Sequence, residues 1–314
     1  MPMIPYLVTY AGVAVFVVAV LARIRMFSKM PMHLRWELYP VPHEKERAQH
    51  GGSYLEEPEW WKKPRHVSKS AEMTAMGREI VFLEALHEHN RKMWWRSFPF
   101  HFGLYLTFTA TVLMALGAAL AHFAGGSWSA VAGAWQILIA LVAAIGAGLV
   151  FLGALGLLQR RLTDPDLADF TTAADVGNLL FFIVTFGFAL VTFVAFDPRF
   201  VLASEFVHNL LAGHLVPVAS GAAGAMVAVT ACLLATLTAY IPLTHMAHFV
   251  AKYFAYHSVR WNDEPNLPGG PREKLILANL TQKVSWAAPH IQGGGEKSWV
   301  DLATEDFSQY GEHK

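Results

Sequence analysis

Residues 130–158 read AVAGAWQILIALVAAIGAGLVFLGALGLL, and this stretch decides the fold class. Its 29 positions carry no charge, and a bilayer core takes about 20 mainly apolar residues per helix. Four further runs without Lys or Arg have the same character, at residues 4–22, 98–123, 177–196 and 219–250. Since the chain is 54% hydrophobic and only 15% charged over 314 residues, we predict an all-α integral membrane protein with five transmembrane helices.

The basic residues predict how the chain lies in the membrane. Fourteen Lys and Arg fall within residues 23–96, two at 160–161 and seven within 252–314, whereas Arg199 alone falls on the other side. Because cytoplasmic loops carry the excess of Lys and Arg, we predict an N-terminus outside and a C-terminus in the cytoplasm, in the inner (cytoplasmic) membrane. The first run has no basic segment before it and is followed by two arginines, so we interpret it as a retained span and not as a signal peptide.

The predicted spans divide the chain into four parts. They are a first transmembrane helix (1–23), a cytoplasmic loop (24–97), a four-helix domain (98–257) and a cytoplasmic tail (258–314). Apolar residues at helical spacing from Ala71 to Trp95 predict that the loop contains an amphipathic helix at the membrane surface. The tail is too short to build much of a core by itself, so we expect it to lie on the surface of a partner protein.

The sequence lacks the motifs of several function classes. Cys232 is the only cysteine, which excludes a disulfide framework, a covalent haem of the CxxCH type and a cysteine-held iron–sulfur cluster within this chain. No glycine-rich phosphate loop, nucleophile elbow or HExxH zinc motif is present. The five runs contain no Asp or Glu, whereas a proton-coupled transporter is expected to carry buried carboxylates. No nucleic-acid partner is expected.

Histidines supply the remaining chemistry. His101 lies just inside the second run, and His245 and His248 lie near the inner end of the fifth. A neutral imidazole in hydrocarbon needs a hydrogen-bond partner or a metal. Because the second span runs inward to outward and the fifth runs back, His101 lies at the predicted depth of the other two. Two histidines from different helices at one level suit either a six-coordinate b-type haem or a hydrogen-bonded helix interface.

Other residues are weaker candidates for a functional site. Arg160 and Arg161 end the third run at a depth that suits haem propionates. His122 lies 21 residues beyond His101, which is about 31 Å along a helix. It either pairs with a histidine of the outer loop, such as His214, or sits in the headgroup region.

Three segments resemble a known family. They are FHFGLYL (100–106), LLQRRLTDPDLADFTTAADVGNLL (157–180) and IPLTHMAHF (241–249). They are similar to the gamma subunit of respiratory nitrate reductase, a five-span cytochrome b that oxidises quinol, over about residues 98–255. The most specific part is the RRL…P…TT.AD pattern from Arg160 to Asp175. The long first loop and the tail are closer to relatives in the transmembrane complexes of sulfate reducers, which have heterodisulfide-reductase-like partners.

The resemblance implies the haem ligands. His101 matches the first ligand of the family, and the spacing from Pro242 selects His248 as the second, so both are expected to bind the haem iron. His245 is then expected near the haem or a quinone, or in a helix-packing contact. Arg160 is expected, with the arginine that follows it, at the propionates.

The resemblance also bears on the number of haems. The family's outer haem ligands correspond here to Thr111 and Thr230, and threonine does not ligate haem iron. Either the outer haem is absent or it has moved to other ligands, such as His122 and His214. One haem b is favoured.

These inferences predict a haem b-containing membrane subunit of an anaerobic respiratory complex of sulfur metabolism. It is expected to be the quinone-reactive subunit of a multi-subunit oxidoreductase, exchanging electrons between menaquinone or menaquinol and a cytoplasmic iron–sulfur, heterodisulfide-reductase-like subunit. Further complex subunits, membrane lipid and quinone are the other expected partners. His245, Asp175 and His122 are candidates for exchanging the protons of the quinone. The alternative is a membrane anchor subunit without a redox centre of its own.

Overall fold

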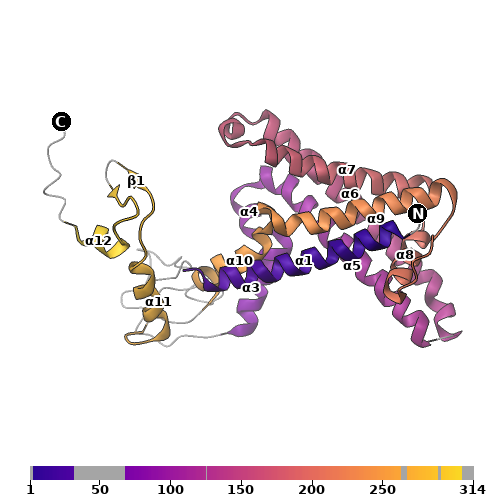
Figure 1. Ribbon diagram of the computed structural model, residues 1–314, viewed down its shortest axis with the longest axis horizontal. Helices are drawn as coiled ribbons and strands as arrows, with labels where there is room; N and C mark the ends of the chain where they lie inside the picture. Colours follow the sequence, from indigo (N-terminus) through magenta and orange to yellow (C-terminus); the bar gives the residue numbers. More distant parts are fainter. Residues whose placement is uncertain (1–2, 32–67, 125, 263–266, 289–290, 306–314) are drawn as a thin grey trace. The chain divides into compact units, whose positions relative to one another are not determined.

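The computed structural model describes residues 3–31, 68–124, 126–262, 267–288 and 291–305, and these residues are predominantly helical (Figure 1). Among them, five helices are long and apolar enough to cross a membrane. They are α1 (Ile4–Lys29), α5 (Arg91–Ala124), α6 (Gly126–Thr163), α7 (Ala173–Ala195) and α9 (Gly221–Tyr240). The chain therefore has the character of an all-α, multi-pass membrane protein.

Shorter elements connect and follow these helices. They are α3 (Lys69–Phe82), α4 (Glu84–His89), η2 (Pro165–Phe170), α8 (Val201–Ala212), η3 (Ile241–Leu243), η4 (His245–Ala247), α10 (His248–Tyr256), η5 (His257–Trp261), α11 (Pro271–Leu280) and α12 (Trp299–Thr304). A short antiparallel pair, β1 (Ala287–Ala288) and β2 (Ile291–Gln292), interrupts the helical pattern of the tail.

The chain forms two compact units. The first unit comprises Met1–Val20 and Arg78–Met246, and the second comprises Leu21–Gly77 and Ala247–Lys314. In the first unit, α6 packs between α5 and α7, and α9 packs against α7 (Figure 1). Phe100, Val150, Phe182, Phe186 and Leu237 form the centre of its core.

Glycines bring α5 and α6 into close contact. A Cβ on Gly103 of α5 would lie 2.6 Å from the backbone nitrogen of Val150. A Cβ on Gly153 of α6 would lie equally close, 2.6 Å, to the backbone nitrogen of Phe100. Small residues allow such close approach of helix backbones in membranes. The contact fixes the rotation of α5 and hence the direction of His101, which lies between Phe100 and Gly103.

Two predicted elements are interrupted. The run predicted as one span over residues 219–250 leaves the α-helical conformation after Tyr240, where Pro242 lacks the N–H that a continuing helix needs. The chain passes through η3 and η4 before α10 begins at His248. The amphipathic helix predicted over residues 71–95 is broken at Leu83, whose φ is 52°, so α3 and α4 are separate helices.

The second unit has a polar and an apolar part. Glu72 is only 3% exposed and contacts His257, and Arg272 is 2% exposed and donates to the carbonyl oxygen of Ser258. Both contacts meet η5, which is a π-helical turn. Six apolar side chains of this unit are also buried among the described residues, namely Ala247, Val250, Trp261, Ile276, Val284 and Leu302.

Candidate functional site

His101 lies on the first unit's helix α5 and is held by a neighbouring residue. Its Nδ1 is 2.8 Å from the carbonyl oxygen of Ser97 and 3.3 Å from the Ser97 hydroxyl, and Ser97 is only 6% exposed. Metal-ligating histidines are commonly oriented by such a hydrogen bond from one ring nitrogen, which leaves the other nitrogen to bind the metal. This hydrogen bond at Nδ1 is compatible with a haem ligand, and ligation by His101 stays a prediction from the sequence.

His248 is the first residue of α10 and is exposed. It belongs to the second unit, whereas His101 belongs to the first. Their pairing on one haem iron stays a prediction from the sequence.

Thr111 and Thr230, which the resemblance aligns with outer haem ligands, have other contacts. Thr111 is exposed, and its hydroxyl donates to the carbonyl oxygen of Thr107 in the same helix. The hydroxyl of Thr230 on α9 is 2.8 Å from that of Thr192 on α7. Thr230 is therefore used in a direct contact between two spans.

The two predicted outer histidines are both exposed. The ring of His122 packs edge-on against Phe123, with centroids 5.0 Å apart. His214 follows the C-terminal end of α8, and its backbone N–H donates to the carbonyl oxygen of Asn209. His122 and His214 are therefore both surface residues. Their binding of a second haem stays a prediction.

Arg160 and Arg161 are tied to the connection that follows α6. Arg160 Nε donates to Asp164 Oδ2 at 3.1 Å, and its Nη1 is 2.8 Å from the Met93 sulfur. Arg161 Nη2 lies 3.9 Å from Asp175 Oδ1. The two guanidinium groups therefore brace the joint between α6 and α7, and their role at haem propionates stays a prediction.

The RRL…P…TT.AD pattern builds this joint. Asp164 caps η2 by accepting from the backbone N–H of Asp166, and Pro165 starts that turn. Thr172 and Asp175 then form a capping box at the start of α7, in which each side chain accepts from the other's backbone N–H. The pattern thus has a local structural explanation that needs no bound group.

Asp175 also faces His245. Its Oδ2 accepts from the backbone and hydroxyl of Thr172, at 3.0 and 2.8 Å. Its Oδ1 is 3.8 Å from Nε2 of His245, whose side chain is 63% exposed. Two of the residues predicted for proton exchange therefore lie together, at the joint where α9 ends and α7 begins.

Sequence reasoning missed the neighbours of this pair. Asn178 lies one turn after Asp175 and is 5% exposed, and its Oδ1 accepts from the Tyr240 hydroxyl at 2.7 Å. Its Nδ2 has no hydrogen-bond partner among the described residues. We call Asp175, Asn178, Tyr240 and His245 the α7 polar cluster. The sequence did contain a signal for this site, because the Asn178 amide lies inside an apolar run and polar groups are costly in a membrane.

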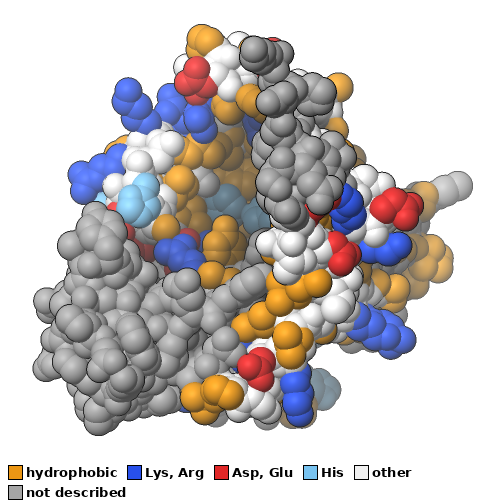
Figure 2. Space-filling model, turned by 90° about the vertical axis from the view of Figure 1, so that its left-hand side faces the viewer, with side chains coloured by type: hydrophobic (Ala, Val, Ile, Leu, Met, Phe, Trp, Pro, Cys, Tyr) orange, Lys and Arg blue, Asp and Glu red, His pale blue; other side chains and the backbone are white. Residues whose placement is uncertain are grey.

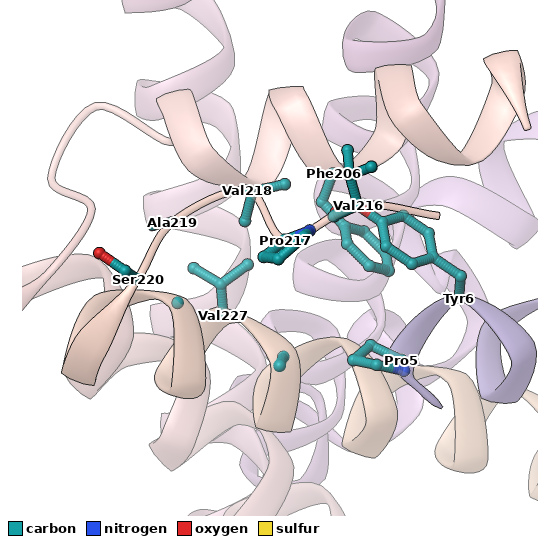
Figure 3. A pocket seen from close by; sticks show the side chains of 11 residues that line it. Pro5, Tyr6, Phe206, Val216, Pro217, Val218, Ala219, Ser220 and Val227 are labelled. Atoms are coloured by element: carbon teal, nitrogen blue, oxygen red, sulfur yellow. The ribbon is translucent and has the colours of Figure 1, made fainter. Parts of the chain in front are cut away.

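A separate pocket lies where α1 begins, in the first unit. It has a volume of about 500 Å³ and is lined by α1, α8, α9 and the segment 216–220 (Figure 3). The rings of Tyr6 and Phe206 stack at 4.5 Å, and the Tyr6 hydroxyl donates to the carbonyl oxygen of Val216 at 2.7 Å. The lining residues are uncharged and mostly apolar, so the pocket suits a neutral apolar group.

No protein-family model, curated protein or solved structure matches this chain.

Proposed function

We propose that this chain is the haem b-containing membrane subunit of an anaerobic respiratory complex. It transfers electrons between menaquinone or menaquinol and a cytoplasmic iron–sulfur subunit of the heterodisulfide-reductase-like kind, and is the quinone-reactive part of that oxidoreductase. The observation that carries the proposal is the hydrogen bond between His101 Nδ1 and the Ser97 carbonyl oxygen, on an apolar helix that is long enough to span a membrane.

One haem b is held by His101 and His248 in this proposal. The haem, when bound, supplies one-electron chemistry. Ser97 orients the first imidazole through Nδ1. The contact between Thr192 and Thr230 supports a single haem, because it fills the α7–α9 interface at the position of an outer ligand.

The second unit supplies the surface for the iron–sulfur partner. Trp286 and Trp299 are 46% and 44% exposed, and aromatic side chains are enriched where proteins bind one another. Figure 2 draws one face of the molecule, on which described acidic, basic and hydrophobic side chains lie interspersed. Residues 32–67 of the predicted docking loop, which was predicted over residues 24–97, lie outside the described residues.

The membrane placement completes the proposal. The chain lies in the inner membrane with its N-terminus outside and its C-terminus in the cytoplasm. The support is the excess of Lys and Arg in residues 23–96 and 252–314.

The test is a haem count on the purified full chain with a reduced-minus-oxidised spectrum. We expect one low-spin b-type haem per polypeptide. His101→Ala and His248→Ala should each abolish the spectrum, because one axial nitrogen is lost, while the control His245→Ala should keep it. A chain without haem would be a membrane anchor and would overturn the proposal, and unchanged spectra in the two ligand variants would overturn the ligand assignment.

A further inference from the structure

The buried amide of Asn178 is the starting observation. Asn178 is 5% exposed, and its Nδ2 has no hydrogen-bond partner among the described residues. The Tyr240 hydroxyl donates to its Oδ1 at 2.7 Å, which fixes the amide so that the N–H groups point away from Tyr240. An unpaired buried donor costs stability, and more so in hydrocarbon, where no water is at hand. A bound ligand that supplies a hydrogen-bond acceptor would remove this cost.

A route from water leads toward this amide. Asp175 precedes Asn178 by three residues, so both side chains lie on one face of α7. The Asp175 oxygen that is not used in the capping box faces two groups, Nε2 of His245 at 3.8 Å and Nη2 of Arg161 at 3.9 Å. Since the His245 side chain is 63% exposed, titratable groups lead from the surface to within one helical turn of Asn178.

The surroundings select a neutral acceptor. The ring of Phe181 packs edge-on against Tyr240, with centroids 5.6 Å apart, and Pro242 beside them is fully buried. Arg161, a basic group near the cluster, is already engaged by Asp175 and by the carbonyl oxygen of Phe170. A carbonyl oxygen on an apolar ring therefore fits Asn178 better than an anion does.

We propose that Asn178 Nδ2 binds a carbonyl oxygen of the quinone headgroup, that Tyr240 positions the amide, and that Asp175 and His245 pass the protons between the quinone and water. This inference rests on the proposed function. A quinol that is oxidised here gives up two protons, which leave through Asp175 and His245. The haem, when bound, would accept its two electrons one at a time for the iron–sulfur partner. Quinone reduction takes up the same two protons and two electrons in reverse.

Binding is tested on the full chain in lipid nanodiscs with a photoreactive azido derivative of menaquinone-2. We expect labelling of the segments around Asn178 and Tyr240, mapped by peptide mass spectrometry and suppressed by unlabelled menaquinone-2. Asn178→Leu removes the donor at similar volume and should weaken binding about tenfold, as loss of one buried hydrogen bond does. Tyr240→Phe removes only the hydroxyl and should weaken binding by less.

The matched control for binding is Thr185→Val. Thr185 is fully buried on the same face of α7, and its hydroxyl likewise has no partner among the described residues. This variant should label like the unaltered chain. Unchanged labelling in Asn178→Leu, or equal loss in Thr185→Val, would overturn the site and indicate that Asn178 binds a buried water only.

The proton route has its own test, the rate at which menaquinol reduces the haem. Asp175→Asn should lower that rate at saturating menaquinol at least about tenfold, as loss of a proton-transfer group does, and leave menaquinone-2 binding unchanged. Thr172→Ala is the control, because it removes the same capping box but keeps the carboxylate. Equal rates in Asp175→Asn and Thr172→Ala would overturn the route.

The haem spectrum separates the two proposals. Specific labelling of a chain without haem would overturn the proposed function and leave the quinone site standing. One haem b with no suppressible labelling at Asn178 would overturn the quinone site and leave the proposed function standing.

Discussion

Glu72 shows how a buried charge is kept in the second unit. Its carboxylate is 2.6 Å from Lys69 Nζ and 2.8 Å from His257 Nε2. Burial alone would raise the pKa of Glu72, but the hydrogen bonds and charges of Lys69 and His257 outweigh it, so the pKa lies below its ordinary value of 4.5. A lowered carboxyl pKa means that the folded state prefers the ionised form. The ionised Glu72 carboxylate therefore stabilises the folded chain at a pH above its ordinary pKa. This stabilisation is lost as the pH falls through the lower pKa that Glu72 has in the folded chain.

Replacing Glu72 should loosen the second unit in a pH-dependent way. Glu72→Gln should lower the free energy of unfolding by about 1–3 kcal/mol at pH 7, because the partners of a buried carboxylate lose its charge. The difference from the unaltered chain should shrink at a pH below the lowered pKa of the folded chain, where that carboxyl is protonated in both folded and unfolded chains. Limited proteolysis of the full chain at both pH values measures it. Glu296→Gln, at an exposed position of the same unit, is the control, and a pH-independent difference would contradict the mechanism.

The sequence predicted some of the residues of the candidate site and missed others. His245 and Asp175 were both candidates for proton exchange, and their side chains lie 3.8 Å apart. Asn178 and Tyr240 were missed, because a contact between two helices depends on how each is rotated about its axis. Hydropathy does not report that rotation. The contact between Glu72 and His257 was beyond sequence reasoning for the same reason, since it joins residues 185 positions apart.

At the scale of elements, composition predicted the spans better than their ends. All five apolar runs correspond to helices long enough to cross a membrane. The fifth was predicted to continue to residue 250, because hydropathy does not register the backbone N–H that Pro242 lacks. The break at Leu83 has a positive φ of 52°. Leucine is disfavoured in that conformation, so no local signal marked the break.

The contact between α5 and α6 should depend on Gly103. Gly103→Ala places a methyl group 2.6 Å from the backbone nitrogen of Val150, so the helices must separate. We expect a loss of about 1–3 kcal/mol, as for overpacked cores, measured as a lower thermal unfolding temperature. Under the proposed function, the displaced His101 should also weaken haem binding.

Gly148→Ala is the control for this change. Gly148 lies on α6, only two residues from Val150, and a Cβ there meets no atom within 4 Å. Alanine is the better helix former by up to about 1 kcal/mol, so this variant should be as stable as the unaltered chain or slightly more. Equal behaviour of the two variants would show that close packing at Gly103 is not what holds α5.

At the scale of the whole molecule, composition predicted that this is a helical membrane protein. It did not predict how the helices pack against one another. A chain with five uncharged apolar runs has one main way to satisfy its backbone in a bilayer, which is to form helices. Which faces of these helices meet is decided by local features such as Gly103 and the pair of Thr192 and Thr230. The division into two units separates His101 from His248, and no pattern of hydropathy indicated that division.

The membrane orientation is a property of the whole chain and is open to a direct test. The distribution of Lys and Arg predicts that Ser220 lies outside the cell and Ser285 in the cytoplasm. Both serines are exposed in the structure, so a cysteine at either place is accessible from its own side.

Cys232, the only native cysteine, is first replaced by Ala to give a background without thiols. In intact spheroplasts, a membrane-impermeant maleimide should label Ser220→Cys at once and Ser285→Cys only after the membrane is ruptured. Labelling in the opposite order would invert the topology, and the proposed iron–sulfur partner would then face the wrong compartment.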